Sequence, residues 1–242
     1  MIKEISSKTN PKIKMVCSLK DKKYRNEYSL FVSEGKNNFE MALEMKLVKE
    51  VYVLKEIKGL KGVEQYLVTK DIMEKISSQV NPEGIVAVCH KKEEKISEDA
   101  NKLVYLDNIN DPGNMGTLIR TALALGYDGL VYSSNSVDIY NEKVIASSKG
   151  AIFKLPLVCA DDIKEVFPKH KIIVSALSNN SVSLDKIDKV NQFILVLGNE
   201  THGVRKELLE TADYVVKIPM NNIDSLNVAV AGGILMYELQ KI

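Results

Sequence analysis

Five polar side chains, gathered in three segments of this 242-residue chain, have the chemistry to bind and orient a substrate. They are Asn114, Arg120, Glu200, Ser225 and Asn227. Amides and hydroxyls orient a ligand through hydrogen bonds, a carboxylate accepts a proton, and a guanidinium binds phosphate or carboxylate. Each segment follows a short apolar run, so we expect the three to lie at one edge of a sheet.

The first segment contains Arg120, which is one of only three arginines in a chain with 30 lysines. An arginine in an otherwise apolar helix indicates a need for the fixed guanidinium fork, which suits phosphate better than an ammonium does. The alternative is a structural ion pair with Asp107 or Asp111, and the residues alone leave both interpretations open. Asn114 follows the turn 111–113 and is expected to cap the helix.

The other two segments are a glycine-bounded loop at 198–203 and the residues that precede an apolar helix at 226–239. Val204 stands where a phosphate-binding P-loop requires lysine, and no GxGxxG pattern occurs, so neither nucleotide fingerprint is supported. The loop is expected to offer backbone groups to a ligand. Ser225 is the expected N-cap of the last helix, with the amide of Asn227 available to bond outward.

The elements that must hold these segments alternate between short apolar strands and helices. Strands are expected at 103–106, 129–132, 172–176, 193–197 and 214–218, and helices at 114–125, 141–148, 163–167, 203–209 and 226–239. This alternation predicts an α/β fold with a mostly parallel sheet that is covered on both faces. Ligands of such sheets bind beyond the carboxyl ends of the strands.

The first third of the chain predicts a separate, smaller α/β unit. Helices are expected from residue 11 and at 36–45 and 71–78, with strands at 28–33, 51–54, 66–69 and 84–90. The charged stretch 91–95 is the expected linker, which predicts domains at 1–95 and 96–242.

The charge of the chain is unevenly distributed. Residues 1–97 hold 19 Lys and Arg against 14 Asp and Glu, a net of +5, and residues 98–242 hold 14 against 18, a net of −4. Eight basic side chains among the first 25 residues face only Glu4 and Asp21. This favours contact with a polyanion at the N-terminal end, although a merely solvated lysine face fits the charge equally well.

The cysteines and the lengths of the apolar runs indicate the cellular compartment of the protein. Cys17, Cys89 and Cys159 lie about seventy residues apart without a CxxC pair, so reduced thiols are expected, and no structural zinc. Apolar runs such as 193–197 fall far short of the roughly 20 residues that span a bilayer, and no signal peptide is visible. We therefore expect a cytoplasmic protein without a membrane segment.

In order and spacing, the three segments resemble the motifs of the SpoU/TrmH family of RNA 2′-O-ribose methyltransferases, within the SPOUT superfamily. Residues 111–126 match D-P-x-N-x-G-x-x-x-R-x-A-x-x-x-G, and residues 198–203 match G-x-E-x-x-G. Residues 218–228 match I-P-M followed by S-L-N-V, with four intervening residues in place of the usual five. Residues 31–35 (FVSEG) resemble the ribosomal-protein-like RNA-binding domain that precedes the catalytic domain in this family.

The resemblance implies a deep trefoil knot in the C-terminal domain and S-adenosylmethionine as the methyl donor for a ribose 2′-hydroxyl. It assigns cofactor contacts to Leu177, Gly198, Ile218 and Leu226. It assigns the catalytic end to Asn114, Arg120, Glu200, Ser225 and Asn227. No metal is implied. A homodimer is implied, in which Arg120 serves the site of the partner subunit.

The implied substrate is RNA, with ribosomal RNA favoured over transfer RNA, and residues 1–95 are the implied RNA-binding domain. One alternative is a non-enzymatic RNA-binding or ribosome-assembly factor on a degenerate methyltransferase scaffold, against which the retained polar residues argue. A related knotted enzyme that modifies a base is less favoured still, because Asn114 and Arg120 together fit the ribose-methylating motif.

Overall fold

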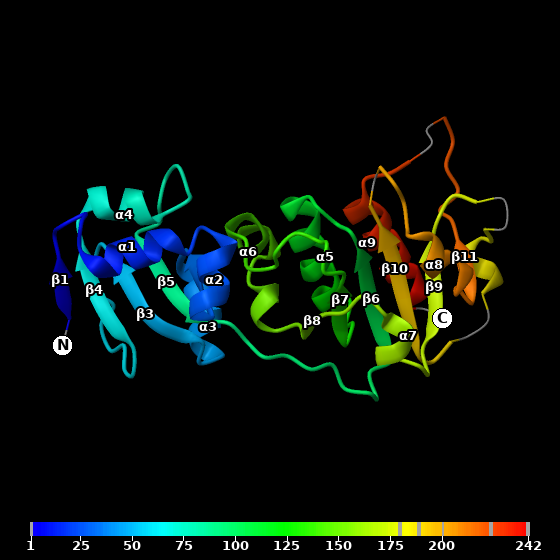
Figure 1. Ribbon diagram of the computed structural model, residues 1–242, viewed down its shortest axis with the longest axis horizontal. Coiled ribbons are helices and arrows are strands. Elements are labelled where there is room, and N and C mark those ends of the chain that lie inside the picture. Colours follow the sequence, from blue (N-terminus) through cyan, green and yellow to red (C-terminus); the bar gives the residue numbers. More distant parts are fainter. Residues whose placement is uncertain (1, 179–180, 188–189, 200, 223–224, 241–242) are drawn as a thin grey trace. The chain divides into compact units, whose positions relative to one another are not determined.

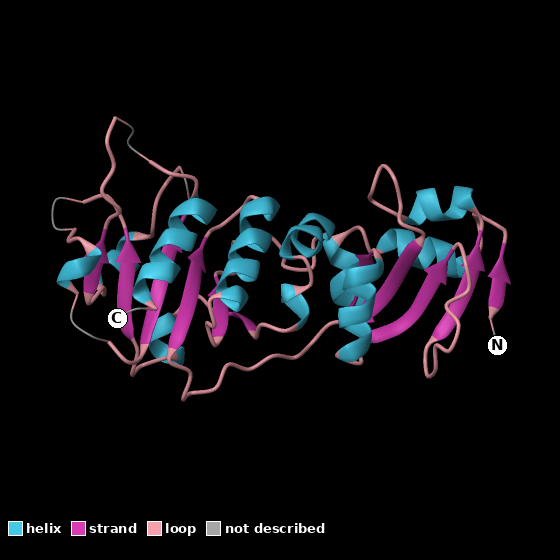
Figure 2. Cartoon of the chain, turned by 180° about the vertical axis from the view of Figure 1, so that it is seen from behind, coloured by secondary structure: helices cyan, strands magenta, loops and turns pink. Residues whose placement is uncertain are grey.

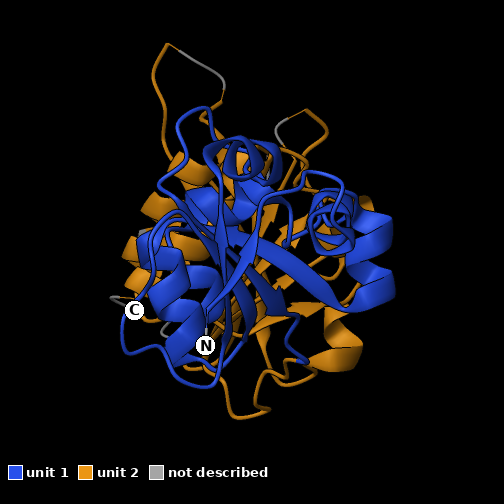
Figure 3. Ribbon diagram, turned by 90° about the vertical axis from the view of Figure 1, so that its left-hand side faces the viewer, with its two compact units in different colours: residues 1–93, 138–153 blue, residues 94–137, 154–242 orange. Residues whose placement is uncertain are grey.

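A computed structural model describes residues 2–178, 181–187, 190–199, 201–222 and 225–240. The chain divides into two compact units (Figure 3). Unit 1 comprises residues 1–93 and 138–153, and unit 2 comprises residues 94–137 and 154–242. The first boundary between the units therefore falls inside the charged stretch 91–95.

Unit 1 is a small α/β unit built on a mixed sheet (Figure 1). Its elements are β1 Lys3–Ile5, α1 Pro11–Ser18, α2 Lys22–Tyr28, β2 Leu30–Glu34, α3 Lys36–Glu44, β3 Val48–Val53, β4 Glu64–Val68, α4 Lys70–Ile76, β5 Ile85–His90 and α6 Glu142–Ser148. The strand order is β1-β4-β3-β5-β2, with β1 and β3 parallel to β4, and β5 antiparallel to both β3 and β2. Strand β1, which is very short, was not predicted from the sequence, and the helical pattern predicted from residue 11 towards Lys20 or Tyr24 is divided between α1 and α2.

The helices of unit 1 begin where local chemistry favours it. Asn10 caps α1, since its side chain accepts a hydrogen bond from the backbone N–H of Lys12 at 2.9 Å, and Pro11 occupies the first turn. Asp21 caps α2 in the same way through the N–H of Lys23 at 2.8 Å. Helix α1 then buries Ile13 and Val16 in the core of the unit.

Residues 138–153 lie between two strands of unit 2 in the sequence but pack within unit 1. The ring centroids of Tyr140 and Phe153 lie 4.6 and 6.2 Å from the ring centroid of Phe31 on β2. Arg25, on α2, is almost fully buried and donates from Nε and Nη2 to Asp138 Oδ2 at 2.9 and 2.7 Å. Residues 138–153 therefore complete the core of unit 1 beside its edge strand β2.

Unit 2 is built on a sheet whose six named strands are all parallel, where a mostly parallel sheet was predicted. Its elements are β6 Lys102–Asp107, α5 Pro112–Ala124, β7 Gly129–Tyr132, β8 Leu157–Cys159, α7 Ile163–Val166, β9 Lys171–Ser175, β10 Phe193–Gly198, α8 Lys206–Glu210, β11 Tyr214–Val216 and α9 Val228–Leu239. The strand order is β11-β9-β10-β6-β7-β8, and each of these strands runs parallel to its neighbours. The prediction of an α/β fold with a parallel sheet after a small α/β unit is confirmed.

Helices cover both faces of this sheet (Figure 2). Alternate strand residues such as Tyr105 and Val196 share one core cluster with Phe167 after α7 and Leu208 of α8. The pleat turns the intervening residues to the other face, where α5 and α9 pack. A Cβ on Gly232 of α9 would lie 2.5 Å from Leu118 and 2.7 Å from Leu197, so glycine allows this close approach.

No helix in the described parts of the chain is long and apolar enough to cross a membrane.

We predict that Arg25→Met lowers the free energy of unfolding by about 3 kcal/mol, because it leaves the Asp138 carboxylate buried without its counter-charge. Lys3→Met is the matched control. It breaks the Lys3–Glu64 pair, which has the same N–O distance of 2.7 Å but side chains more than half exposed, and it should change stability little. Urea unfolding followed by circular dichroism measures both, and equal losses would contradict the prediction.

Candidate functional site

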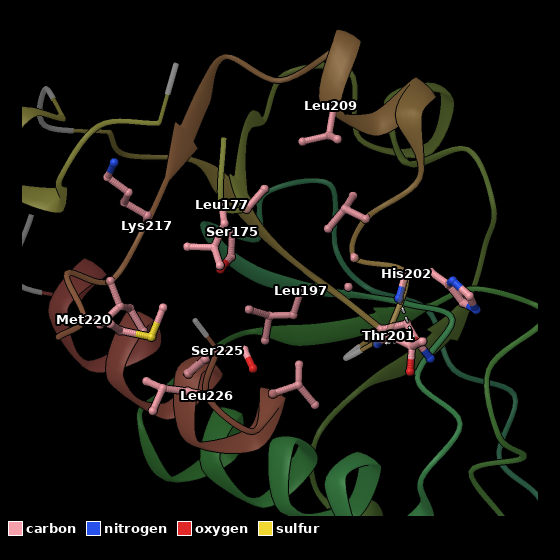
Figure 4. A pocket seen from close by; sticks show the side chains of 18 residues that line it. Ser175, Leu177, Leu197, Thr201, His202, Leu209, Lys217, Met220, Ser225 and Leu226 are labelled. Atoms are coloured by element: carbon pink, nitrogen blue, oxygen red, sulfur yellow. Dashed lines mark hydrogen bonds between the residues drawn. The ribbon is translucent and has the colours of Figure 1, made fainter. Parts of the chain in front are cut away.

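A pocket of about 410 Å³ lies beyond the carboxyl ends of the adjacent strands β9, β10 and β11 (Figure 4). Its walls include Leu177 after β9, Leu197 and Gly198 at the end of β10, Ile218 after β11, and Leu226 before α9. The volume lies within the range of pockets that bind small molecules, and the position is the one expected for a parallel sheet. Ligand binding at this edge is therefore structurally supported.

All four residues predicted to contact a cofactor line this one pocket, although they come from segments up to 49 positions apart in the sequence. They are Leu177, Gly198, Ile218 and Leu226. Leu177 is 61% exposed at the wall of this pocket. A bound ligand would cover this apolar surface. The contacts of these residues with a ligand stay predictions.

The loop after β10 explains why glycine stands at both of its ends. A Cβ on Gly198 would lie only 2.4 to 2.5 Å from the backbone of Gly203 and Val204, so any larger residue would force the loop open. Gly203 has a φ of +70°, which favours glycine. Its N–H donates to the carbonyl of Asn199 at 2.8 Å and closes the turn.

Asn199 holds this loop from within and was missed in the sequence analysis. Its Oδ1 accepts from the N–H groups of Thr201 and His202 at 2.8 and 3.2 Å, and its Nδ2 donates to the carbonyl of Asn108 at 3.0 Å. The side chain thus ties the loop after β10 to the loop after β6. Its position directly after a strand-ending glycine was the available signal.

Two asparagines join the first and third predicted segments. Asn227 Nδ2 donates to Asn114 Oδ1 at 3.0 Å. Asn227 Oδ1 also accepts from the N–H groups of Ala229 and Val230 at 3.0 and 3.3 Å, which makes Asn227 the N-cap of α9. The structure therefore brings Asn114 and Asn227 together, beside the pocket residues Ser225 and Leu226.

Two capping predictions were wrong. Asp111, and not Asn114, caps α5, since its carboxylate accepts from the N–H of Asn114 at 2.7 Å and Pro112 fills the first helical position. Ser225 does not cap α9, because the helix begins two residues later than expected and Asn227 takes that role. Ser225 lines the pocket instead.

Arg120 is exposed, and its side chain has no hydrogen-bond or ion-pair partner within the described part of the chain. Both carboxylates proposed as structural partners are engaged elsewhere, Asp107 by Arg205 and Asp111 by the helix cap. Arg120 lies six residues after Asn114, roughly 9 Å along the helix, and does not line the pocket.

Glu200 lies outside the described residues, and so do two of the four residues in the shortened loop of the third motif, Ile223 and Asp224.

The loop after β10 is anchored by a buried carboxylate. Asp107, only 1% exposed, accepts from the backbone N–H of Arg205 at 2.8 Å and from its Nε at 2.7 Å. Arg205 Nη2 donates to the hydroxyl of Tyr105 at 2.7 Å. Burial raises the pKa of Tyr105 to about 12, against the opposing effect of the neighbouring guanidinium, so the hydroxyl keeps its proton.

We predict that Asp107→Asn speeds amide hydrogen exchange across residues 199–205, because it removes the charge-assisted bonds that hold the loop to the end of β6. Asp213→Asn is the matched control. Its carboxylate accepts from Lys171 and from the N–H of Ile172 at 2.8 and 2.9 Å, away from the pocket. Exchange measured by mass spectrometry should change at 199–205 only in the first variant, and unchanged exchange there would refute the anchor.

Comparison with known proteins follows the same division of the chain. Residues 101–237 match the model of the SpoU rRNA methylase family, and residues 10–87 match that of an MRM3-like substrate-binding domain. A relative from Bacillus subtilis (strain 168) is 36% identical over 251 residues, which cover 99% of this chain and all of the relative. It is named 23S rRNA (guanosine(2553)-2′-O)-methyltransferase RlmP.

Solved structures agree. An AdoMet-bound rRNA methyltransferase from Sinorhizobium meliloti superposes with a TM-score of 0.91 at 26% identity, over 99% of this chain and 98% of that one. The SpoU methyltransferase AviRb from Streptomyces viridochromogenes, in complex with AdoMet, superposes with a TM-score of 0.85 at 25% identity, over 96% and 97%. With more than half of its length matched by the family model and a full-length relative above 30% identity, the chain belongs to the SpoU rRNA methylase family.

Proposed function

We propose that this protein transfers a methyl group from S-adenosylmethionine to a ribose 2′-hydroxyl of RNA, with ribosomal RNA favoured over transfer RNA. The observation that carries the proposal is that segments of the second and third motifs line one pocket at the carboxyl edge of the sheet, while Asn114 of the first motif accepts a hydrogen bond from Asn227 of the third. The relative named as a 23S rRNA 2′-O-methyltransferase and the AdoMet-bound structural neighbours support the reaction and the cofactor. The cytoplasm is the proposed compartment, since it holds the ribosomal RNA.

The pocket fits the cofactor in size and in chemistry. Leu177, Leu197 and Leu226 offer apolar walls, and the tight turn at Gly198 brings backbone groups to the edge of the cavity. When bound, S-adenosylmethionine supplies an electrophilic methyl group. The role of the surrounding residues is to exclude water and to align the acceptor hydroxyl with that group.

The polar residues would then orient the ribose and receive its proton. Asn114 and Asn227 are neutral at any working pH and hold the ribose through hydrogen bonds. Arg120 clamps a phosphate of the target and polarises the hydroxyl, because a guanidinium only donates hydrogen bonds and is a poor base. The proton passes to phosphate, water or Glu200.

We further propose a homodimer in which Arg120 completes the site of the partner subunit. Helix α9 leaves Val230, Ile234 and Tyr237 exposed by 53, 39 and 50%, and their spacing places them on one helical face. Arg120 on the neighbouring α5 is exposed and does not line the pocket of its own chain. Both features fit an interface across α5 and α9.

The deep trefoil knot is also proposed. The segment after β11 would pass through the loop that follows β9, and a parallel bridge joins Val182 of that loop to Val216, the last residue of β11.

The reaction is tested with labelled S-adenosylmethionine and RNA that lacks the modification, followed by nucleoside analysis. We expect labelled 2′-O-methylnucleoside in the large ribosomal RNA. Transfer only to an unfinished ribosomal particle would place the reaction during ribosome assembly. Absence of cofactor binding would refute the proposal and favour the non-enzymatic RNA-binding factor.

Arg120→Lys is expected to lower kcat by about tenfold or more, because an ammonium keeps the charge but loses the two-pronged geometry. The affinity for S-adenosylmethionine, measured by calorimetry, should not change, since Arg120 is not a pocket residue. Lys149→Arg, at an exposed cation of unit 1, is the control substitution. Near-normal turnover of the Arg120→Lys variant would show that catalysis does not need the two-pronged geometry of the guanidinium.

Subunit complementation tests the shared site. Arg120→Met and Gly198→Val should each be inactive, the second because its Cβ meets the backbone of Gly203. After the two are mixed and their subunits exchange, about a quarter of the sites should be intact if Arg120 acts across the interface. No recovery of activity in verified mixed dimers would place Arg120 in the site of its own chain.

Ile234→Glu is expected to convert the dimer to a monomer, because it buries a carboxylate in an apolar interface. Val166→Glu, at a residue of α7 that is 43% exposed, is the control. Sedimentation velocity distinguishes the two, and a monomeric unmodified protein would disprove the dimer.

A further inference from the structure

Most of the basic side chains among residues 1–25 form ion pairs or hydrogen bonds with other groups of unit 1. Lys3, Lys8, Lys12 and Arg25 form ion pairs with Glu64, Asp71, Glu50 and Asp138, at 2.7, 3.2, 2.6 and 2.7 Å. Lys20 donates to the carbonyls of Lys75 and Ser77 at 3.3 and 2.9 Å. The described chain gives no acidic partner to the remaining cations of residues 1–25, Lys14, Lys22 and Lys23. Two of these three lie on α2.

Helix α2 places aromatic rings beside those two lysines. Tyr24 and Tyr28, one turn apart, are stacked with ring centroids 6.1 Å apart and planes inclined by 20°. Tyr28 is 44% exposed, and the ammonium of Lys23 lies 5.6 Å from the centre of the Tyr24 ring. The acidic neighbours are Asp21, whose carboxylate caps the helix, and Glu27.

Helix α2 is anchored to the rest of unit 1 through Arg25. Arg25 is buried, donates to Asp138, and donates from Nη1 to the carbonyls of Leu19 and Lys20 at 2.9 and 2.8 Å. The half-buried ring of Tyr24 and the exposed ring of Tyr28 therefore lie on a fixed support and do not have to be ordered when a ligand binds, which lowers the entropic cost of association.

We propose that Lys22, Lys23, Tyr24 and Tyr28, the α2 surface, bind an unpaired segment of the RNA substrate. Bases would stack on the tyrosine rings, and the lysines would contact the flanking phosphates. Residues 22–28 include no aliphatic side chain, so the surface lacks the apolar anchor of a typical protein-docking helix. Aromatic rings interleaved with cations complement a strand that carries both π-faces and negative charge.

This inference rests on the proposed function, which makes RNA the substrate. The match of residues 10–87 to a substrate-binding domain includes α2 and supports a role of this unit in substrate contact. Because residues 138–153 belong to the core of unit 1, deletion of residues 1–95 would expose their apolar side chains. Point variants of the full chain are therefore the appropriate test.

The test measures binding of a single-stranded oligoadenylate and of an RNA duplex, both about 12 nucleotides long, within the site sizes known for single-strand binders. The unmodified protein should bind the oligoadenylate more tightly. Tyr24→Ala/Tyr28→Ala should weaken that binding about tenfold or more, and Tyr24→Phe/Tyr28→Phe, which keeps the rings, should stay within about twofold. Thermal unfolding confirms the fold of each variant, and Tyr28→Ala alone serves if the double variant unfolds.

The charge component is tested with two variants that each lose two lysines. Lys22→Gln/Lys23→Gln should reduce the dependence of log affinity on log salt by about 1.4, whereas Lys3→Gln/Lys8→Gln, whose lysines are already paired, should leave it unchanged.

Three results would overturn the inference: unchanged affinity in the folded alanine variant, equal losses in the alanine and phenylalanine variants, or equal salt effects in the two lysine variants. A chain that binds oligoadenylate through the α2 surface but transfers no methyl group would refute the proposed function and leave this inference intact.

Discussion

A buried carboxylate at the end of the central strand β6 is the constraint on which the site depends. Asp107 is 1% exposed, and an ionised group in such a place must be paired and hydrogen-bonded. Arg205 meets this need with its side chain and its backbone N–H together. Because Arg205 lies two residues after Gly203, which ends the glycine loop of β10, the bonds to this carboxylate also fix that wall of the pocket.

An arginine also pairs with an aspartate in unit 1. This pairing divides the three arginines into two kinds. Arg25 and Arg205 each hold an aspartate that comes from a distant part of the sequence and is buried or nearly so. Arg120 has no such partner in the described chain and stands exposed on α5. In a chain that uses lysine for its solvated charge, arginine is reserved for positions where geometry matters. Two of these positions are structural, and Arg120 is the one for which we propose a contact with the substrate.

The two units divide the proposed task in a way that follows from their surfaces. Unit 2 offers an apolar pocket at the edge of a parallel sheet, suited to a small molecule. Unit 1 pairs Lys3, Lys8 and Lys12 with its own carboxylates, so the number of its N-terminal lysines overstates the surface available to a polyanion. Contact with RNA is then expected to depend on a few unpaired cations beside aromatic rings, and less on a broad basic face.

Local patterns in the sequence were enough to predict much of the structure. Short apolar runs such as 103–106 and 193–197 predicted the parallel strands, and the glycine spacing at 198–203 predicted a tight loop at the carboxyl edge. The four residues expected to contact the cofactor line one pocket, because parallel strands must place their carboxyl ends at the same edge. These features depend on neighbours within a few residues or on the direction of strands.

Only the tertiary structure decided which distant groups meet. Asp138 pairs with Arg25 across 113 positions, Arg205 with Asp107 across 98, and Asn227 with Asn114 across 113. Nor did the sequence indicate that residues 138–153 belong to unit 1, since an amphipathic helix shows that it has an apolar face but not which core will cover it. Periodicity, caps and turns are local and can be read along the chain. The group that pairs with a buried charge, or the surface that covers an apolar face, is decided by how the folded chain brings distant segments together.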